Sequence, residues 1–515
     1  MKLAYLLLAG VAAVTVLAFY GLAGFAGGEV AWELLGDTYL QGILWFSIKQ
    51  ALFSAIGSVL LALPIARALY YQPLFAKQAF LTLCLLGFVL PTLVLVTGLV
   101  AALGRSGWLV SWLGEHWNLY GLQGILLAHI YLNMPFAIRA LYLQLQAIPE
   151  TSWRLARQLK MSPWQRWKMV EWPVLRGRLG VLGGFIFVLC FNSFAVVLAL
   201  GGGPQSTTLE VAIYQALKYD FNIPEALVLA WLQFVIAGGL FLLLSRFGSL
   251  SWLSADTGRQ RWLGLPSRYF SLLNYMIYSI AWLFLLLPLL ALFPGLLVLD
   301  INQLNWMVFI KPSLVSLGLG LFCALAALFM AYIILLPIRA ARYQKKIRRQ
   351  WLLEWLSIHT LVAPAMVLSV GLYIFLLTRI DLDHWGMAVV AGLNTLMVLP
   401  FALQQLRPRL FQFDDQYRPL VRMLKLNPWQ RLRIELPWLR TASQAAFVLV
   451  FLLAMGDVAI FSIFGQRDWM TLPWLIYSYA STYRMAEASL ASFVLLLIFA
   501  VVVAWFERSR QHVKD

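Results

Sequence analysis

The stretch Leu-Lys-Met-Ser-Pro-Trp-Gln-Arg-Trp-Lys-Met-Val-Glu-Trp-Pro, residues 159–173, occurs twice in this chain in nearly the same form. The second copy, Leu-Lys-Leu-Asn-Pro-Trp-Gln-Arg-Leu-Arg-Ile-Glu-Leu-Pro, covers residues 424–437 and is one residue shorter. Both copies are basic and share the centre Pro-Trp-Gln-Arg. A repeat at a separation of 265 positions predicts a chain made of two similar halves.

Other spacings also support a duplication. The dipeptides Pro135-Phe136 and Pro400-Phe401 each begin 28 positions before the proline of the repeated centre. A proline and a glycine seven positions apart also occur in both halves, as Pro91 with Gly98 and Pro364 with Gly371. Chance rarely preserves several spacings at once, so we interpret the two halves as copies of one unit.

The composition places most of this chain in lipid. Of its 515 residues, 62% are hydrophobic and 12% are charged, and the mean hydropathy is +0.79. A water-soluble domain cannot bury that much apolar surface, so we expect an all-α, polytopic membrane protein. Cys84, Cys190 and Cys323 lie inside apolar runs without ligand spacing and are expected to be packing residues.

Apolar windows that approach the length of a membrane-spanning helix occur twelve times. In the first half they lie near 3–24, 42–66, 79–103, 121–146, 179–200 and 224–245, and in the second near 272–297, 308–337, 353–378, 387–406, 442–464 and 485–506. Six spans in each half give both halves the same orientation, which puts the repeat axis along the membrane normal. The first window could be a signal peptide, but its length favours a retained span.

Basic residues predict the orientation of the spans. Segments 154–178, 339–349 and 407–440 hold seven, six and eight Lys or Arg residues. The alternate segments 24–41, 104–120 and 201–223 hold only Arg105 and Lys218, beside six acids. Because basic loops stay on the cytoplasmic side, we expect both termini in the cytoplasm of a bacterial cell, across its inner membrane. The same distribution accounts for the net charge of +17 without a nucleic acid partner.

These features divide the chain into two repeats. The first covers residues 1–245 and contains the repeated loop at 149–178. The second covers residues 272–506 and contains its loop at 407–440. Residues 246–271 are expected to form a cytoplasmic linker, and residues 507–515 a cytoplasmic tail.

The repeated loop is larger than a turn between spans requires. Its first copy predicts a helix over Ser152–Leu159, a break near Ser162, and a second helical stretch that ends before Pro173. Ser162 and Asn427 are favourable N-caps, and each is followed by the proline favoured at a first helical position. One such loop alone would suggest a segment held on anionic lipid. Two copies on matching halves favour a docking surface for a two-fold partner, with Trp164 and Trp429 as anchors.

The loop resembles the cytoplasmic signature of ATP-binding-cassette importer permeases, which is Glu-Ala-Ala, three residues, Gly, nine residues, Ile, one residue and Leu-Pro. Here Arg154-Leu155-Ala156 stands for the opening triplet, and Lys160 and Lys425 stand for the glycine. The resemblance implies a coupling role for Arg154, Ala156, Lys160, Ser162, Pro163, Trp164, Pro173, Lys425, Asn427, Pro428, Trp429 and Pro437. The fused twelve-span layout is similar to the ferric-iron and thiamine group of this family, and residues 120–129 and 200–220 resemble thiamine transporter permeases.

The resemblance implies partners that carry out the ATP chemistry. The sequence contains no Gly-x-x-x-x-Gly-Lys-Ser/Thr motif, so it predicts no phosphate-binding loop. We therefore expect no cofactor on this chain, with ATP and Mg²⁺ held by two copies of a cytoplasmic ATPase. A periplasmic binding protein would supply the substrate. The chain also lacks paired carboxylates or a nucleophile motif, so we expect no enzymatic activity of its own.

Polar residues inside the spans are candidates for the translocation pathway, because they are costly in lipid. The candidates are Asp457 with its repeat mate Ser193, the neighbouring Asn192, and the mates His129 and Asn394. The alternative for each residue is a hydrogen bond that only holds the bundle together. Thiamine is a flat cation and suits one acid among aromatic rings, whereas ferric iron requires several oxygen donors.

The sequence favours a permease for thiamine and its phosphate esters, and two alternatives stay open. One is a ferric-iron permease of the same family. The other is an ion-coupled secondary transporter with two six-span halves, which would leave the repeated loops without a role. That class also predicts a charged signature between the second and third spans, where segment 67–77 holds two bases and no acid.

Overall fold

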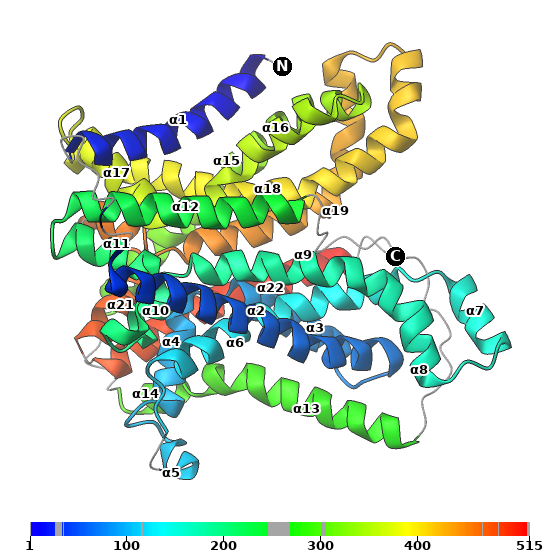
Figure 1. The fold of residues 1–515 in the computed structure, drawn as a ribbon, viewed down its shortest axis with the longest axis horizontal. Coiled ribbons are helices and arrows are strands. Elements are labelled where there is room, and N and C mark those ends of the chain that lie inside the picture. The colour runs from blue at the N-terminus through cyan, green and yellow to red at the C-terminus, as the bar shows by residue number, and fades with distance from the viewer. Residues whose placement is uncertain are drawn as a thin grey trace.

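A computed structural model describes residues 2–25, 33, 36–114, 117–245, 268–299, 305–465, 467–482 and 484–511 of the chain. These residues form helices and no strands (Figure 1). Ten helices are long and apolar enough to cross a membrane, and the number rises to twelve if each of two bent helix pairs counts as one span. Residues 246–267 of the expected linker and residues 512–515 of the expected tail lie outside the described residues.

The helices follow the two expected sets. The first set is α1 (Lys2–Phe25), α2 (Thr38–Tyr71), α3 (Lys77–Val89), α4 (Thr92–Leu103), α5 (Val110–Leu113), α6 (Leu122–Gln146), α7 (Glu150–Gln158), α8 (Pro163–Arg166), α9 (Trp172–Phe191), α10 (Ala195–Leu200), α11 (Leu209–Lys218) and α12 (Ile223–Ser245). The second set is α13 (Arg268–Leu290), α14 (Phe293–Leu297), α15 (Met307–Tyr343), α16 (Ile347–Ile358), α17 (Ala365–Leu377), α18 (Leu382–Met423), α19 (Pro428–Met455), α20 (Phe461–Phe464), α21 (Leu472–Ser481) and α22 (Met485–Gln511).

The third span of each half is broken, which corrects the expectation of continuous helices over 79–103 and 353–378. The axes of α3 and α4 differ by 103°, and α16 with the short turn after it meets α17 at 86°. Pro91 and Pro364 stand at the two breaks with extended ψ angles of 130° and 126°. A proline disfavours helical geometry in the residue before it and cannot donate a backbone hydrogen bond, so both helices stop there.

The fifth spans are also interrupted, where the sequence predicted continuous windows at 179–200 and 442–464. Helix α9 ends at Phe191 and α19 ends at Met455, and the short helices α10 and α20 follow after a few residues. Asn192 and Asp457 lie directly at these interruptions. Both halves therefore place irregular backbone at corresponding points along the third and fifth spans.

The two repeated loops differ in how their helices are divided. The second stretch of the first loop does not end before Pro173, as expected, but continues into α9 through a π-helical turn at Trp167–Glu171. In the second loop, α18 continues to Met423 and α19 begins at Pro428, so most of the expected loop 407–440 is helical. A π-turn accommodates one extra residue in a helix, which explains why the first copy is one residue longer.

The first helix of each half packs on the opposite half. Helix α1 lies against α17 and α15, whereas α13 lies against α2 and α4 (Figure 1). The contacts between the exchanged helices are close, because a Cβ added at Gly98 would overlap the carbonyl oxygen of Pro288. A Cβ added at Gly371 would overlap that of Ala18 in the same way. The halves are therefore interlocked and not simply side by side.

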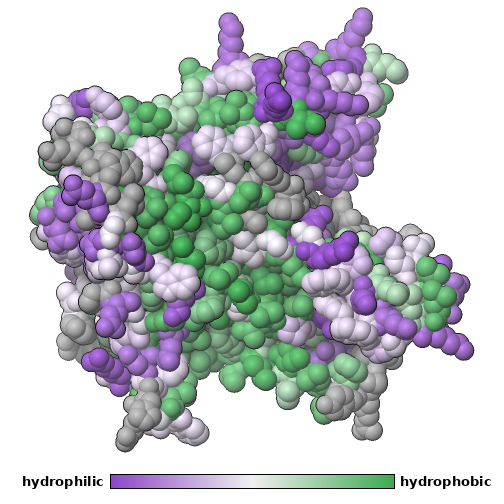
Figure 2. Space-filling model, in the orientation of Figure 1, coloured by the Kyte–Doolittle hydropathy of each residue, from purple (hydrophilic) through white to green (hydrophobic). Residues whose placement is uncertain are grey.

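The surface has the polarity of a membrane protein. Figure 2 shows a hydrophobic region across the middle of the molecule, with hydrophilic side chains gathered toward the two ends. One end, on the right of Figure 1, carries α7, α8 and the beginning of α19. The opposite end carries α10, α11 and α21. Below, these ends are called the loop end and the gate end.

Candidate functional site

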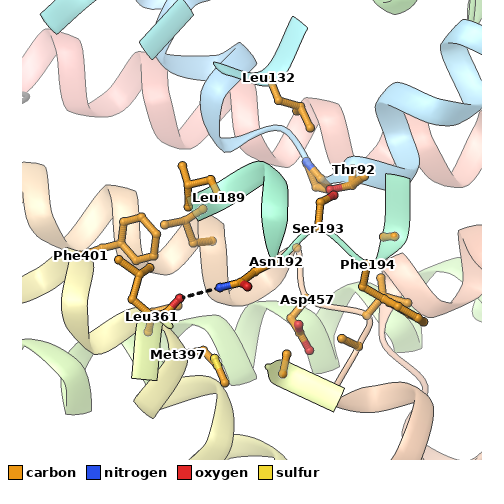
Figure 3. Close-up of a pocket in the computed structure, with 18 of the residues that line it drawn as sticks. Thr92, Leu132, Leu189, Asn192, Ser193, Phe194, Leu361, Met397, Phe401 and Asp457 are labelled. Carbon is orange, nitrogen blue, oxygen red and sulfur yellow. Dashed lines mark hydrogen bonds between the residues drawn. The ribbon is translucent and has the colours of Figure 1, made fainter. Parts of the chain in front are cut away.

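A cavity of about 360 Å³ lies where the interrupted spans of the two halves meet. Its lining includes every residue that the sequence proposes for the pathway, namely His129, Asn192, Ser193, Asn394 and Asp457. Residues on both sides of the two proline breaks also line it. Figure 3 shows Asp457, Asn192 and Ser193 pointing into this space from neighbouring segments. The structure thus brings together five polar residues that are spread over more than 300 positions of sequence.

Asp457 lies just beyond the helix end of α19 and is held by its own turn. Its Oδ2 accepts a hydrogen bond from the backbone N–H of Ile460 at 3.1 Å. Among the described residues that line the cavity, Asp457 is the only acid. The alternative role for Asp457 was a hydrogen bond to another helix that holds the bundle together. Within the described residues, the Asp457 carboxylate instead accepts hydrogen bonds from backbone N–H groups close to it in sequence. The carboxylate is therefore positioned locally, at the border of the cavity.

Asn192 occupies the matching place after α9 and bridges the two halves. Its Nδ2 donates to the carbonyl oxygen of Leu361 at 3.1 Å, and its Oδ1 accepts from Gln233 at 3.0 Å. Gln233 also donates to Glu210, whose other oxygen accepts from the N–H of Met366 at 3.1 Å. Asn192 thus lines the cavity, and it also makes a hydrogen bond that holds the helix bundle together.

His129 has one partnered and one unpartnered ring nitrogen. Its Nδ1 lies 3.2 Å from Oγ of Ser54 on α2. Its Nε2 is buried and has no hydrogen-bond partner in the described part of the chain. A buried polar atom without a partner is costly unless water or a ligand reaches it. The cavity wall therefore contains a buried ring nitrogen without a partner among the described residues.

Aromatic side chains close the cavity toward the gate end. Phe194, which lines the cavity of about 360 Å³, contacts Tyr214 of α11 with ring centroids 5.0 Å apart. Trp474 and Tyr477 of α21 form a second pair at 5.2 Å. Between these pairs remains a void of only about 20 Å³. We call Phe194, Tyr214, Trp474 and Tyr477 the aromatic layer, and its pairs come from the two halves.

Both repeated loops contain the predicted caps. Oγ of Ser162 accepts from the N–H of Gln165 at 3.3 Å, and the Gln165 side chain accepts from the N–H of Ser162 at 2.8 Å. Asn427 and Gln430 form the same reciprocal pair at 2.8 and 3.0 Å. These capping boxes confirm the predicted N-caps, and they place Pro163 and Pro428 at the first position of α8 and α19.

Lys160 and Lys425 adopt the left-handed conformation, with φ angles of 47° and 48°. They follow α7 and α18, and the next N–H in each loop bonds back to the carbonyl of Ala156 or Val421. This is a helix-terminating geometry that normally selects glycine. The structure therefore explains why the family signature has glycine where this chain has lysine.

The remaining loop residues are divided between surface and helix interior. The tips are open, because Trp164 is 69% exposed and Trp429 is 62% exposed. Arg154 is also exposed and pairs with Glu150 at 2.8 Å, whereas Ala156 is buried. Pro173 and Pro437 lie within the helices that lead from the loops into the membrane. The two tryptophans are thus available to a partner.

An ion pair that was not predicted from the sequence occurs in both halves. Arg67 of α2 donates to Glu171 at 2.8 Å, and Arg339 of α15 donates to Glu435 at 2.7 Å. Glu171 and Glu435 each stand two residues before the proline that closes the repeated motif. The repeat itself contained this signal, because the acid is retained in both copies among otherwise basic residues.

Comparison with known proteins agrees with this architecture. No protein-family model matches the chain. The thiamine transport system permease protein ThiP of Haemophilus influenzae is 36% identical over 499 residues, covering 94% of this chain and 91% of that protein. The protein of the same name from Escherichia coli is 35% identical over 523 residues, covering 98% and 96%. A putative ferric transport system permease protein of Haemophilus influenzae is 23% identical over 480 residues, covering 87% and 74%.

The interlocked helical halves, the cavity between them and these relatives together define a multi-pass transport permease of the ATP-binding-cassette class. More narrowly, the chain belongs to the family of thiamine transport system permease proteins.

Proposed function

We propose that this permease carries thiamine and its phosphate esters across the bacterial inner membrane, through the cavity that Asp457 borders. The observation that carries the substrate assignment is the single acid beside a layer of four aromatic rings. Thiamine combines a permanent positive charge with two flat rings, and aromatic faces and carboxylates both attract such a cation. An isolated acid at membrane depth is costly, and a cationic substrate offsets that cost.

The repeated loops are the proposed contact with the energy source. Two copies of a cytoplasmic ATPase, which hold ATP and Mg²⁺, would each receive one loop through Trp164 or Trp429. Exposed aromatic side chains are typical anchors at protein interfaces, and both tryptophans stand at the capped start of a helix. A substrate-binding protein outside the membrane would deliver thiamine at the gate end, where the aromatic layer must part to admit it.

This arrangement places the loop end in the cytoplasm. The support is the concentration of bases there, as the positive-inside rule requires. The beginning of the chain lies at the same end, because Arg349 of the basic segment 339–349 donates to the hydroxyl of Tyr5 at 2.6 Å. Both termini are accordingly proposed to be cytoplasmic.

Reconstitution of transport tests this function. The chain would be purified with its ATPase, inserted into proteoliposomes, and supplied with binding protein and labelled thiamine. We expect uptake that requires ATP, and we expect no ATP hydrolysis by the chain alone. Uptake driven by an ion gradient without ATP would identify a secondary transporter instead. ATP-dependent uptake of labelled ferric ion, without uptake of labelled thiamine, would favour the ferric-iron alternative.

A further inference from the structure

Helices α2 and α15 carry corresponding contacts at both of their ends. They are the second spans of the two halves, and each contacts its repeated loop at one end and a gate-end helix at the other. Ser47 and Arg67 mark the two ends on α2, and Ser316 and Arg339 mark them on α15. At a rise of about 1.5 Å per residue, these pairs lie roughly 30 to 35 Å apart, close to the thickness of a membrane's hydrocarbon core.

At the loop end, each helix holds the acid of the repeated motif with an arginine and a tyrosine. On α2, Arg67 and the hydroxyl of Tyr71 both donate to Glu171, at 2.8 and 2.6 Å. On α15, Arg339 and the hydroxyl of Tyr332 donate to Glu435, both at 2.7 Å. Both glutamates are fully buried. Such charge-assisted bonds resist separation, so the loop and the helix are expected to move together.

The second half strengthens this contact with further charges. Arg339 also makes two bonds of 2.7 Å to Asp414 of α18, and Arg431 donates to Glu435 at 2.6 Å. Arg418 lies 3.7 Å from Asp414. Three bases and two acids thus join α15, α18 and α19, whereas the first half relies on the one arginine pair.

At the gate end, each helix supplies a cap to a helix that carries the aromatic layer. Oγ of Ser47 accepts from the N–H of Leu209, the first residue of α11, at 2.9 Å. Oγ of Ser316 accepts from the N–H of Leu472, the first residue of α21, at 2.8 Å. The first N–H groups of a helix have no partner inside it, so these serines satisfy a buried donor from another helix.

The local capping residues do not perform this role. Thr208 and Thr471 occupy the N-cap positions of α11 and α21, yet neither makes a side-chain cap. Their hydroxyls are buried and have no hydrogen-bond partner within the described residues. Threonine is normally a good N-cap. In both halves, the first N–H of the gate-end helix is therefore capped by the serine of the second span.

Helix α2 also contacts the cavity wall between its two ends. Gln50 donates to the carbonyl oxygen of Cys190 at 3.0 Å, two residues before Asn192. Ser54 contacts His129. On α15, Cys323 lies 3.4 Å from the carbonyl oxygen of Ala391, one helical turn before Asn394. A displacement of either helix would therefore reach the cavity as well as the gate end.

We infer that α2 and α15 are struts that transmit movement between the cytoplasmic loops and the aromatic layer, with Arg67 and Arg339 as positioning residues at one end and Ser47 and Ser316 at the other. A loop displaced by the ATPase pulls its glutamate, the glutamate pulls the strut, and the strut serine displaces the start of α11 or α21. When the binding protein docks at the gate end, the same contacts transmit the movement in the opposite direction, to the ATPase. This inference rests on the proposed function.

The serine end can be tested in the reconstituted complex by measuring basal ATP hydrolysis and its stimulation by thiamine-loaded binding protein. We expect Ser47→Ala and Ser316→Ala to keep basal hydrolysis and each to reduce the stimulation about fivefold, the factor for one buried hydrogen bond worth about 1 kcal/mol. Ser58→Ala is the matched control, because Ser58 is a buried serine of α2 whose one hydrogen bond within the described residues goes to the carbonyl of Ser54 in its own helix.

The charged end gives a test that does not depend on the serines. Arg67→Glu should abolish stimulation, and the exchanged pair Arg67→Glu with Glu171→Arg should restore much of it. A role limited to folding would instead show parallel changes in assembly and basal hydrolysis. Equal stimulation in Ser47→Ala, Ser316→Ala and Ser58→Ala would overturn the strut, as would failure of the exchanged pair to restore stimulation in an assembled complex. A wild-type complex without any stimulation would reject the proposed function itself.

Discussion

Gly98 of α4 lies directly against the backbone of Pro288 of α13, so closely that no side chain fits between them. The same relationship recurs between Gly371 of α17 and Ala18 of α1. In lipid, helices associate mainly through close packing, and small residues permit the closest approach. These two contacts therefore fix the exchanged first helices on their opposite halves.

We predict that Gly98→Ala and Gly371→Ala each weaken this packing by about 1–3 kcal/mol, the usual cost of overfilling a close contact. The measurement is the melting temperature of the purified permease in detergent, with the yield of assembled complex as a second readout. Gly10→Ala on α1 is the control, since a Cβ there meets nothing within 4 Å. Equal melting of all three variants would contradict the prediction.

Asp457→Asn separates charge from shape in the cavity. We expect the efficiency of thiamine uptake to fall roughly tenfold or more, because an ion contact of this kind is worth at least about 1.4 kcal/mol. The uncharged thiophene analogue of thiamine, in which carbon replaces the cationic nitrogen, should lose much less. Assembly and basal ATP hydrolysis should stay near wild type. An equal loss for both substrates would assign Asp457 a structural role.

Replacement of the exposed tryptophans tests the loops. Trp164→Ala and Trp429→Ala should each weaken association with the ATPase or uncouple its hydrolysis from uptake, since loss of a central aromatic anchor costs about 2 kcal/mol or more. Pull-down of the ATPase and the ratio of ATP hydrolysed to thiamine transported would be measured. If the double variant assembles and transports normally, the loops are better interpreted as elements that bind the lipid surface.

Lys160→Gly and Lys425→Gly should stabilise the loops. The left-handed conformation costs a non-glycine residue about 1–2 kcal/mol, and glycine adopts it freely. We therefore expect slower proteolysis of each loop in the glycine variant. Lys160→Ala and Lys425→Ala remove the charge but keep the strained backbone, so they should bring no such gain. A matching gain in the alanine variants would attribute the effect to charge.

The sequence predicted the parts of this structure that depend on local chemistry. Ser162 and Asn427 cap their helices as expected, because capping depends on a few neighbouring residues. The constant offset between the two repeats paired Asp457 with Ser193 and His129 with Asn394, and all four residues line one cavity. Their role in translocation stays a prediction.

Other parts depend on contacts that hydropathy does not encode. The breaks at Pro91 and Pro364 were missed because the residues on both sides of each proline are mostly apolar, so the windows 79–103 and 353–378 appeared continuous. The pairing of Arg67 with Glu171 joins residues 104 positions apart, which belong to the separately considered segments 67–77 and 154–178. Glu210 was counted among the acids of an outer segment, yet it is fully buried beside Met366.

The exchange of first helices also determines the order in which the molecule can be completed. Helix α1 ends at Phe25 and its partner α17 begins at Ala365. At a synthesis rate of about 5–20 residues per second, α1 waits in the bilayer for roughly 17 to 70 seconds before that partner is made. The first half thus cannot mature by itself. A single polypeptide keeps the two partners at a high effective concentration, so this late pairing does not depend on finding a separate subunit by diffusion.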